Sequence, residues 1–280
     1  TGIALRNYER EVKFYREIAD TVDIRLPHCY HGEWDEATGD FVLVLEDMAP
    51  AQQGDQITGC TPEMALAAVD ELAGLHAPRW DDPTLADLDW LGRRTSTEDV
   101  DAVVGLWGMF LPSFLEGYGA HLDQPQLDLL GAFGSRMDGW MGEHSGPKTV
   151  THGDYRLDNL LFGDGSSAPM VTAVDWQTPG HGPPVADLSY FCGAGLTPPE
   201  RRIHDRALVE AYAASLARRG VDTDDGWLWE QYRREAFGGV VMAVIASQVV
   251  GESERSEAMF AAMATRHLQH ALDLGALDLI

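Results

Sequence analysis

A polar loop flanked by apolar segments, at residues 149–176, constrains this chain more than any other part of its sequence. Thr149-Val150-Thr151 leads into His152-Gly153-Asp154-Tyr155-Arg156-Leu157-Asp158-Asn159, and Leu160-Leu161-Phe162 follows the loop. Gly163-Asp164-Gly165-Ser166-Ser167 supplies turn residues, and a second apolar run at 170–174 ends at Asp175. The pattern predicts two short strands joined by a turn, set within a chain that is mainly helical from Thr61 onwards.

The predicted hairpin brings two oxygen donors together. If its strands pair antiparallel, Asn159 enters the first strand at the end where Asp175 leaves the second. Amide and carboxylate oxygens are hard ligands that suit magnesium shared with triphosphate oxygens. Asp154 lies on the same loop, within reach of a substrate hydroxyl beside a metal-bound phosphate. The loop and hairpin therefore predict in-line phosphoryl transfer, which depends on a positioned base and on metal ions that bridge the phosphates.

The same residues resemble a known signature. His152-Gly153-Asp154, Asn159 and Val174-Asp175-Trp176 are similar in type and spacing to the motifs of the aminoglycoside phosphotransferase and choline kinase family. The resemblance extends over most of the chain. It implies an α+β, protein-kinase-like fold with a small β-containing N-lobe, incomplete here, and a large, mainly helical C-lobe. We place the N-lobe remnant and hinge at residues 1–48 and the C-lobe at residues 49–280, because a polar, glycine-containing connector begins there.

By this resemblance the catalytic residues are Asp154, as the base, and Arg156, which steadies the charge of the transferring phosphoryl group. Asn159 and Asp175 hold Mg²⁺. His152 and Asp187 support the site, His152 as a structural residue and Asp187 by anchoring the backbone of the catalytic loop from below.

The resemblance also implies a nucleotide site for ATP or GTP. Glu11 matches the helix glutamate that pairs with an ATP-binding lysine. The adenine would face the backbone of the hinge, formed by Glu46, Asp47 and Met48.

One departure from the family pattern concerns that lysine. The family begins with a glycine-rich hairpin and a lysine-bearing strand, and neither precedes Glu11 here; Lys13 and Lys148 are the only lysines. The sequence starts without a methionine, so we expect the missing strands upstream of Thr1 in a longer protein. The alternative is a lobe-deficient, catalytically weak or inactive kinase-like protein that binds nucleotide or another ligand. A metal-dependent hydrolase using the same aspartates is a third reading, against which the absent His-Asp ligand pattern argues.

Composition limits the partners. A net charge of −25 argues against nucleic-acid binding, which needs a basic face. The charge slightly favours a cationic acceptor for the small-molecule hydroxyl substrate, although an acidic solvated surface is the simpler explanation. Three scattered cysteines favour a reducing, cytoplasmic location. We expect no membrane association, because no stretch reaches the roughly 18–20 apolar residues of a spanning helix, the closest being 236–250. The sequence does not specify an oligomeric state.

Periodicity supplies the remaining elements. It predicts a helix over 7–19 with Asn7 as its N-cap, and a strand at Phe41–Leu45 buried on both faces because its apolar run is continuous. Thr61 and Pro62 are a typical helix start. Further helices are expected over 100–118, 124–142, 201–219, 228–251 and 254–274.

Overall fold

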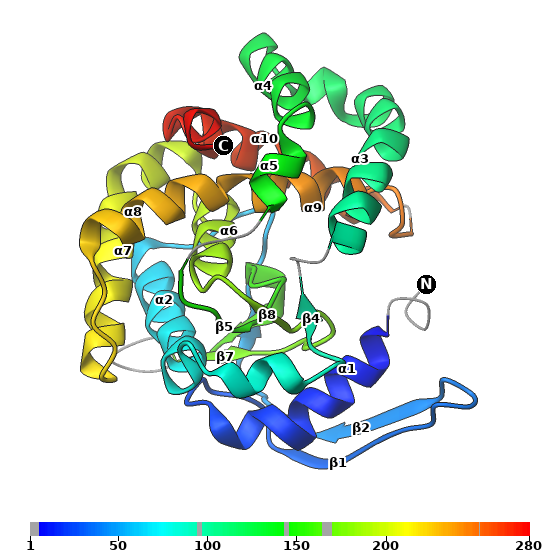
Figure 1. The fold of residues 1–280 in the computed structure, drawn as a ribbon, viewed down its shortest axis with the longest axis vertical. Coiled ribbons are helices and arrows are strands. Elements are labelled where there is room, and N and C mark those ends of the chain that lie inside the picture. The colour runs from blue at the N-terminus through cyan, green and yellow to red at the C-terminus, as the bar shows by residue number, and fades with distance from the viewer. Residues whose placement is uncertain (1–5, 94–96, 143–145, 164–169, 252) are drawn as a thin grey trace.

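The computed structural model describes residues 6–93, 97–142, 146–163, 170–251 and 253–280, and it has the predicted α+β architecture, with long helices around short strands (Figure 1). Helix α1, Asn7–Lys13, continues through a π-helical turn, Phe14–Ile18, and a 3-10 turn, Ala19–Thr21. Its N-cap is Arg6 and not the expected Asn7, which is already helical. The face of this segment formed by Val12, Phe14 and Ile18 is buried.

An antiparallel pair, β1 (Cys29–Trp34) and β2 (Phe41–Leu45), packs beneath α1 at the lower edge of Figure 1. The prediction that Phe41–Leu45 is buried on both faces is wrong, because Val42 is 44% exposed and Val44 is 48% exposed. Within the part of the chain that the structure describes, β2 pairs with β1 alone. Helix α1 therefore covers one face of the pair, and the other face meets solvent.

Two small sheets lie at the centre of the larger part of the molecule. One has the order β3-β6-β7, formed by Gln52–Gln53, Leu160–Phe162 and Val171–Ala173. The other has the order β4-β8-β5, formed by Gly92–Arg93, Gly180–Gly182 and Thr149–Thr151. The first sheet contains the predicted hairpin, in which Leu160 faces Ala173 and Phe162 faces Val171. Its turn, 164–169, lies outside the described residues.

Helices surround these sheets. Helix α2 (Pro62–His76) begins as predicted, since the Thr61 side chain accepts a hydrogen bond from the backbone N–H of Met64. The others are α3 (Thr97–Tyr118), α4 (Gln124–Gly134), α5 (Met137–Met141), α6 (Val185–Gly195), α7 (Pro198–Arg218), α8 (Asp225–Arg234), α9 (Gly238–Ala246) and α10 (Glu254–Asp273). The segments predicted as single helices over 124–142 and 228–251 are each divided in two, the second by a 3-10 turn at Glu235–Phe237.

Buried side chains form two clusters. The first joins the π-helical turn that follows α1 to α2, the central strands and helices α6, α7 and α8. The second lies among α3, α4, α5, α9 and α10. Helix α6 contributes to both, through Leu188 and Phe191 to the first and through Tyr190 to the second. This helix therefore lies where the two cores meet.

One helix of the described chain, Val100–His121, is long and apolar enough to cross a membrane by length and composition alone. It is not the stretch at 236–250 that the sequence places closest to that limit. Only 11% of its most apolar window is buried, so much of this surface faces outward. Such a criterion does not place the helix in a bilayer, and the absence of membrane association stays a prediction.

Candidate active site

The backbone of the candidate catalytic loop, residues 152–159, is held from below by helix α6. The carboxylate of Asp187 accepts the backbone N–H of His152 at 2.6 Å and that of Gly153 at 3.0 Å. It also contacts His76 Nε2 at 3.3 Å. Burial acts to raise the pKa of Asp187. The hydrogen bond and charge of His76, together with the charge and backbone N–H of His152, outweigh burial and hold the pKa below its usual value. The predicted supporting aspartate therefore lies directly against the loop backbone.

His152 lies inside the loop and faces the hairpin. Its Nε2 donates to the carbonyl oxygen of Val174 at 3.1 Å, which leaves Nδ1 to accept the backbone N–H of Asp154 at 3.3 Å. The ring also packs on Trp176, with centroids 4.4 Å apart. His152 thus ties the loop to the strand that precedes Asp175, and its position is that of a structural residue.

Gly153 is required by a close approach of two backbones. Its φ is +80°, in the left-handed region, and a Cβ atom there would lie 2.2 Å from the carbonyl oxygen of Thr178. The glycine before the candidate base therefore lets the loop lie against the segment that follows Asp175.

The carboxylate of Asp154 has three side-chain donors. Its Oδ2 accepts Arg156 Nε at 3.0 Å and Asn159 Nδ2 at 2.9 Å, and its Oδ1 accepts the hydroxyl of Tyr190 at 2.7 Å. Arg156 also donates to Asp158 at 2.7 Å. The carboxylate is only partly buried, so it is oriented by its neighbours and still open on one side.

The two predicted metal ligands meet at the open end of the hairpin. The backbone N–H of Val174 donates to the carbonyl oxygen of Asn159 at 3.0 Å, which places Asp175 beside Asn159 as the antiparallel register requires. Asp175 has a φ of +65°, a strained conformation of the kind that concentrates at functional sites. Burial and then the charge of Asp154 raise the pKa of Asp175.

Glu11 reaches this region from helix α1. The backbone of Trp176 and the side chain of Gln177, the two residues that follow Asp175, act on the Glu11 carboxylate as hydrogen-bond donors that lower its pKa. Burial and the nearby charge of Asp175 raise the pKa of Glu11 to about 7. Helix α1 is further fixed by Phe14, which stacks on Trp176 with ring centroids 3.8 Å apart. Glu11 therefore lies against the segment that bears the candidate metal ligand.

The predicted hinge lies apart from this cluster. The Glu46 carboxylate accepts the backbone N–H of His28, and that of Asp47 accepts the N–H of Ala49. Glu46, Asp47 and Met48 line a small cavity of about 160 Å³ with Gly163, Met170 and Thr172 of the hairpin. The structure thus places the hinge against the hairpin that carries the candidate site, with two of its side chains engaged by the neighbouring backbone.

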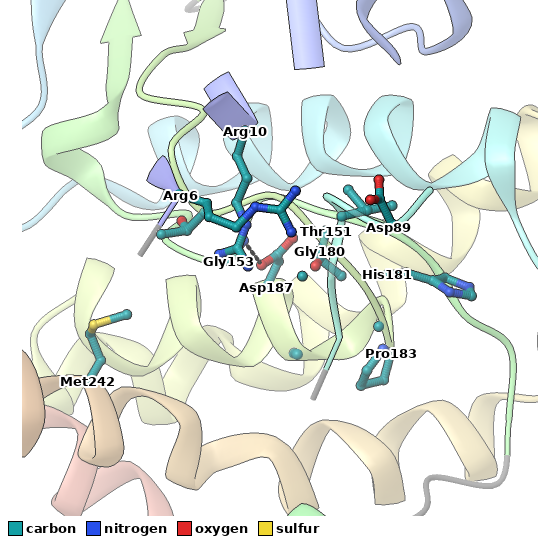
Figure 2. Close-up of a pocket in the computed structure, with 15 residues that line it drawn as sticks. Arg6, Arg10, Asp89, Thr151, Gly153, Gly180, His181, Pro183, Asp187 and Met242 are labelled. Atoms are coloured by element: carbon teal, nitrogen blue, oxygen red, sulfur yellow. Dashed lines mark hydrogen bonds between the residues drawn. The ribbon is translucent and has the colours of Figure 1, made fainter. Parts of the chain in front are cut away.

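A larger cavity, about 590 Å³, opens beside Gly153 (Figure 2). Arg6 and Arg10 of the α1 segment extend into it from one side, and Thr151, Gly180 and His181 lie on the opposite side with Asp187 beneath them. Asp89 contributes a negative charge and Met242 of α9 an apolar edge. The lining is therefore mixed in charge and does not share the strong acidity of the whole chain.

The sequence motifs do not predict one contact to the candidate base. Tyr190, 36 residues along the chain from Asp154, lies one helical turn after Asp187 on α6. Residues three apart on a helix share a face. The three-residue spacing from Asp187 is therefore the sequence signal for a second contact from the same helix.

Known proteins resemble this chain in both sequence and fold. A model of a family described as the phosphotransferase enzyme family matches residues 2–233. Acyl-CoA dehydrogenase family member 10 of Mus musculus is 42% identical over 50 residues, which make up 18% of this chain and 5% of that protein. The matched segment thus covers a small fraction of that relative's length.

Solved structures share the fold at low identity. An ethanolamine kinase of Plasmodium vivax has a TM-score of 0.57 at 12% identity, with 91% of this chain and 70% of that one covered. A choline/ethanolamine kinase family protein from Mesorhizobium loti has a TM-score of 0.54 at 18% identity, covering 96% and 84%. The GDP complex of wild-type aminoglycoside 2'-phosphotransferase-IIIa has a TM-score of 0.55 at 12% identity, covering 98% and 84%.

Proposed function

Because the chain belongs to the phosphotransferase enzyme family, we propose that it transfers the γ-phosphate of ATP or GTP to a hydroxyl group of a small molecule. The family match confirms the resemblance seen in the loop and hairpin motifs. The observation that carries the proposal is the convergence of Asp154, Asn159 and Asp175 at one end of the β6–β7 hairpin. A base and two oxygen donors at one place are the groups that in-line phosphoryl transfer needs.

In the proposed reaction Asp154 accepts the proton of the acceptor hydroxyl. The hydroxyl oxygen attacks the γ-phosphorus, the bond to the bridging oxygen breaks, and the nucleoside diphosphate leaves with the electron pair. Because Asp154 is held by Arg156, Asn159 and Tyr190, the carboxylate is oriented before the acceptor arrives.

The residues fit a bound Mg²⁺. The amide nitrogen of Asn159 donates to Asp154, which leaves its oxygen as the atom for a cation. The carboxylate of Asp175 is repelled by those of Asp154 and Glu11, and a divalent ion would offset this repulsion. Among the described residues, no three His, Cys, Asp or Glu side chains could hold an ion together, so its remaining ligands would be phosphate and water oxygens. When bound, the ion neutralises the charge that develops on the phosphates.

Arg156 is the proposed cation for the transferring phosphoryl group. In this structure its guanidinium joins Asp154 to Asp158, and it also contacts the sulfur of Met259. The arginine is thereby held next to the base. A phosphoryl group bound there would compete with two carboxylates for the same guanidinium.

The nucleotide and the acceptor are assigned to two sides of the site. We place the adenine along the backbone of Glu46–Met48 and the acceptor in the cavity lined by Gly153, the residue that precedes the base in sequence. The Arg6, Arg10 and Asp89 lining suits an acceptor that carries polar groups of both signs better than a polycation. We expect a cytoplasmic enzyme with no role in nucleic-acid or membrane binding.

One observation supports a second candidate, a kinase-like protein that binds nucleotide but turns it over weakly. Glu11, the proposed partner of a lysine, is engaged by the segment after Asp175. Of the two lysines in the sequence, Lys13 pairs with Glu9 at 2.9 Å, and Lys148 directly precedes strand β5.

Asp154→Ala tests the proposal. With Mg²⁺ and ATP or GTP, across a panel of amino-alcohol, sugar and aminoglycoside hydroxyls, the wild type should form nucleoside diphosphate and phosphorylated acceptor. Turnover in the variant should fall by about 10²–10⁴-fold, the range for loss of a general base. Asp222→Ala, which removes an exposed carboxylate outside the site, is the control.

Two outcomes would decide against the proposal. Undiminished turnover in Asp154→Ala would remove Asp154 as the base. Nucleotide binding by the wild type, without turnover on any member of the panel, would favour the weak or inactive alternative.

A further inference from the structure

The two oxygens of the Asp154 carboxylate differ in their surroundings. Oδ2 accepts two hydrogen bonds, from Arg156 and from Asn159, and so has both lone pairs occupied. Within the described part of the chain, Oδ1 accepts one hydrogen bond, at 2.7 Å, from the hydroxyl of Tyr190. One lone pair of Oδ1 therefore remains for an incoming proton.

We propose, on the basis of the phosphotransferase function above, that Tyr190 is a positioning residue that orients Asp154 so that Oδ1 receives the proton of the acceptor hydroxyl. Tyr190 gives up no proton in this step. The acceptor proton passes to Oδ1, the acceptor oxygen bonds to the γ-phosphorus, and the nucleoside diphosphate departs with the electrons of the broken P–O bond.

The fold holds the Tyr190 ring in place from two directions. Tyr190 is 6% exposed, and its backbone belongs to α6, whose Asp187 grips the loop backbone one turn earlier. Its ring stacks on His267 of α10, with centroids 5.3 Å apart and planes inclined by 13°. Because the Tyr190 backbone is helical and its ring is stacked on His267, the side chain has little freedom to rotate away from Asp154.

The His267 ring is itself held in a tight pocket between two glycines. It is 1% exposed, and two glycines make room for its ring: a Cβ atom on Gly193 would lie 2.5 Å from it, and one on Gly239 2.1 Å. Burial, with the charges of Arg201 and Arg266, lowers the pKa of His267 to about 3, so the ring is uncharged near neutral pH. It therefore supports Tyr190 without adding a positive charge that would compete for Asp154.

The test compares two tyrosines. Tyr190→Phe keeps the ring and its stack on His267 and removes only the hydroxyl on Asp154. Tyr232→Phe is the matched control, because the Tyr232 hydroxyl is also buried and donates to a carboxylate, that of Asp205, at 2.6 Å. Thermal melting of both variants reports the structural cost, and ATP hydrolysis with Mg²⁺ and water as acceptor reports turnover.

We expect kcat of Tyr190→Phe to fall about tenfold, as for a lost hydrogen bond to a charged group, while KM for ATP stays unchanged. Tyr232→Phe should lower the melting temperature and leave kcat at the wild-type value. In an Asp154→Asn background, adding Tyr190→Phe should cause no further loss, because its effect passes through the base. A wild-type kcat in Tyr190→Phe, or an equal loss in both backgrounds, would overturn the proposal.

A second readout separates this inference from the proposed function. Crystal structures of the wild type and Tyr190→Phe should show the Asp154 carboxylate rotated or spread over several orientations only in the variant. That result in a wild-type protein without turnover would uphold the positioning contact and reject phosphoryl transfer. An unchanged carboxylate in the variant would reject the positioning role, whatever the activity.

Discussion

At the scale of single residues, Gly153 gives the clearest prediction. Gly153→Ala places a Cβ atom against the Thr178 carbonyl and forces a left-handed conformation that costs an L-residue roughly 1–2 kcal/mol. We expect the melting temperature to fall by at least about 2 °C. Turnover should fall with it, because Asp154 is the next residue. Differential scanning calorimetry and the phosphotransfer assay measure the two effects.

Gly105→Ala on α3 is the matched control, since a Cβ atom at Gly105 would have no neighbour within 4 Å. Alanine is favoured over glycine inside a helix by about 1 kcal/mol, so this variant should melt at the same temperature or higher. If both substitutions had the same effect, the close approach of Gly153 to Thr178 could not be the cause.

The sequence predicts residues of the site well when they share one local segment. Asp154, Asn159 and Asp175 lie on one loop and one hairpin, so strand register alone brings them together. Tyr190 and the environment of Glu11 depend on how α6 and α1 pack against that hairpin. Tertiary packing sets those contacts. The spacing of Asp187 and Tyr190 indicates that they share a helix face, but it does not say what that face contacts.

At the scale of elements, the contact between α6 and the catalytic loop predicts a pH dependence. The folded pKa of Asp187 lies below the unfolded value of about 3.9. Its contribution to stability is therefore complete above about pH 4 and is lost as the pH falls through the folded pKa. Asp187→Asn should be less stable than the wild type at pH 7 by about 2 kcal/mol, and the gap should narrow below about pH 4.

Urea unfolding of both proteins between pH 7 and pH 3 measures this gap. Other carboxylates titrate in the same range, but they are common to both proteins and cancel in the difference. A gap that stayed constant down to pH 3 would show that the Asp187 carboxylate does not stabilise the loop through its charge.

The sequence predicts elements correctly where local signals are strong and incorrectly where tertiary packing decides the outcome. Thr61 and Pro62 start a helix by local chemistry, and α2 begins there. The apolar run at 41–45 indicates a fully buried strand, yet its burial depends on neighbours, and the described chain covers one face only. The segment at 228–251 has a continuous helical pattern, but it breaks at Glu235–Phe237, just before Gly238 and Gly239, and the His267 ring packs against Gly239.

At the scale of the whole molecule, the fold class follows from the loop and hairpin, whereas the acceptor does not. The cavity beside Gly153 is assembled from α1, the segment before β4, strands β5 and β8, and Met242 of α9. These segments lie far apart in sequence, so their combined charge and shape arise only when the chain folds. The net charge of −25 is a sum over the surface, and the mixed lining of this cavity does not follow it.

The position of α6 between the two buried clusters leads to a prediction for native-state hydrogen exchange. Opening α6 would break both cores and both of its contacts to the catalytic loop, so its amides should exchange only on global unfolding. Only 11% of the most apolar stretch of helix α3 is buried. Because few contacts hold this helix, its amides should exchange through local openings of lower free energy. With increasing urea, the free energy of exchange of the α6 amides should fall with the slope of global unfolding. The free energy of exchange of the α3 amides should at first change little with urea. If α6 instead exchanged as easily as α3, the loop and the base it holds would be free to move in the folded protein, and a rigidly oriented Asp154 could not be maintained.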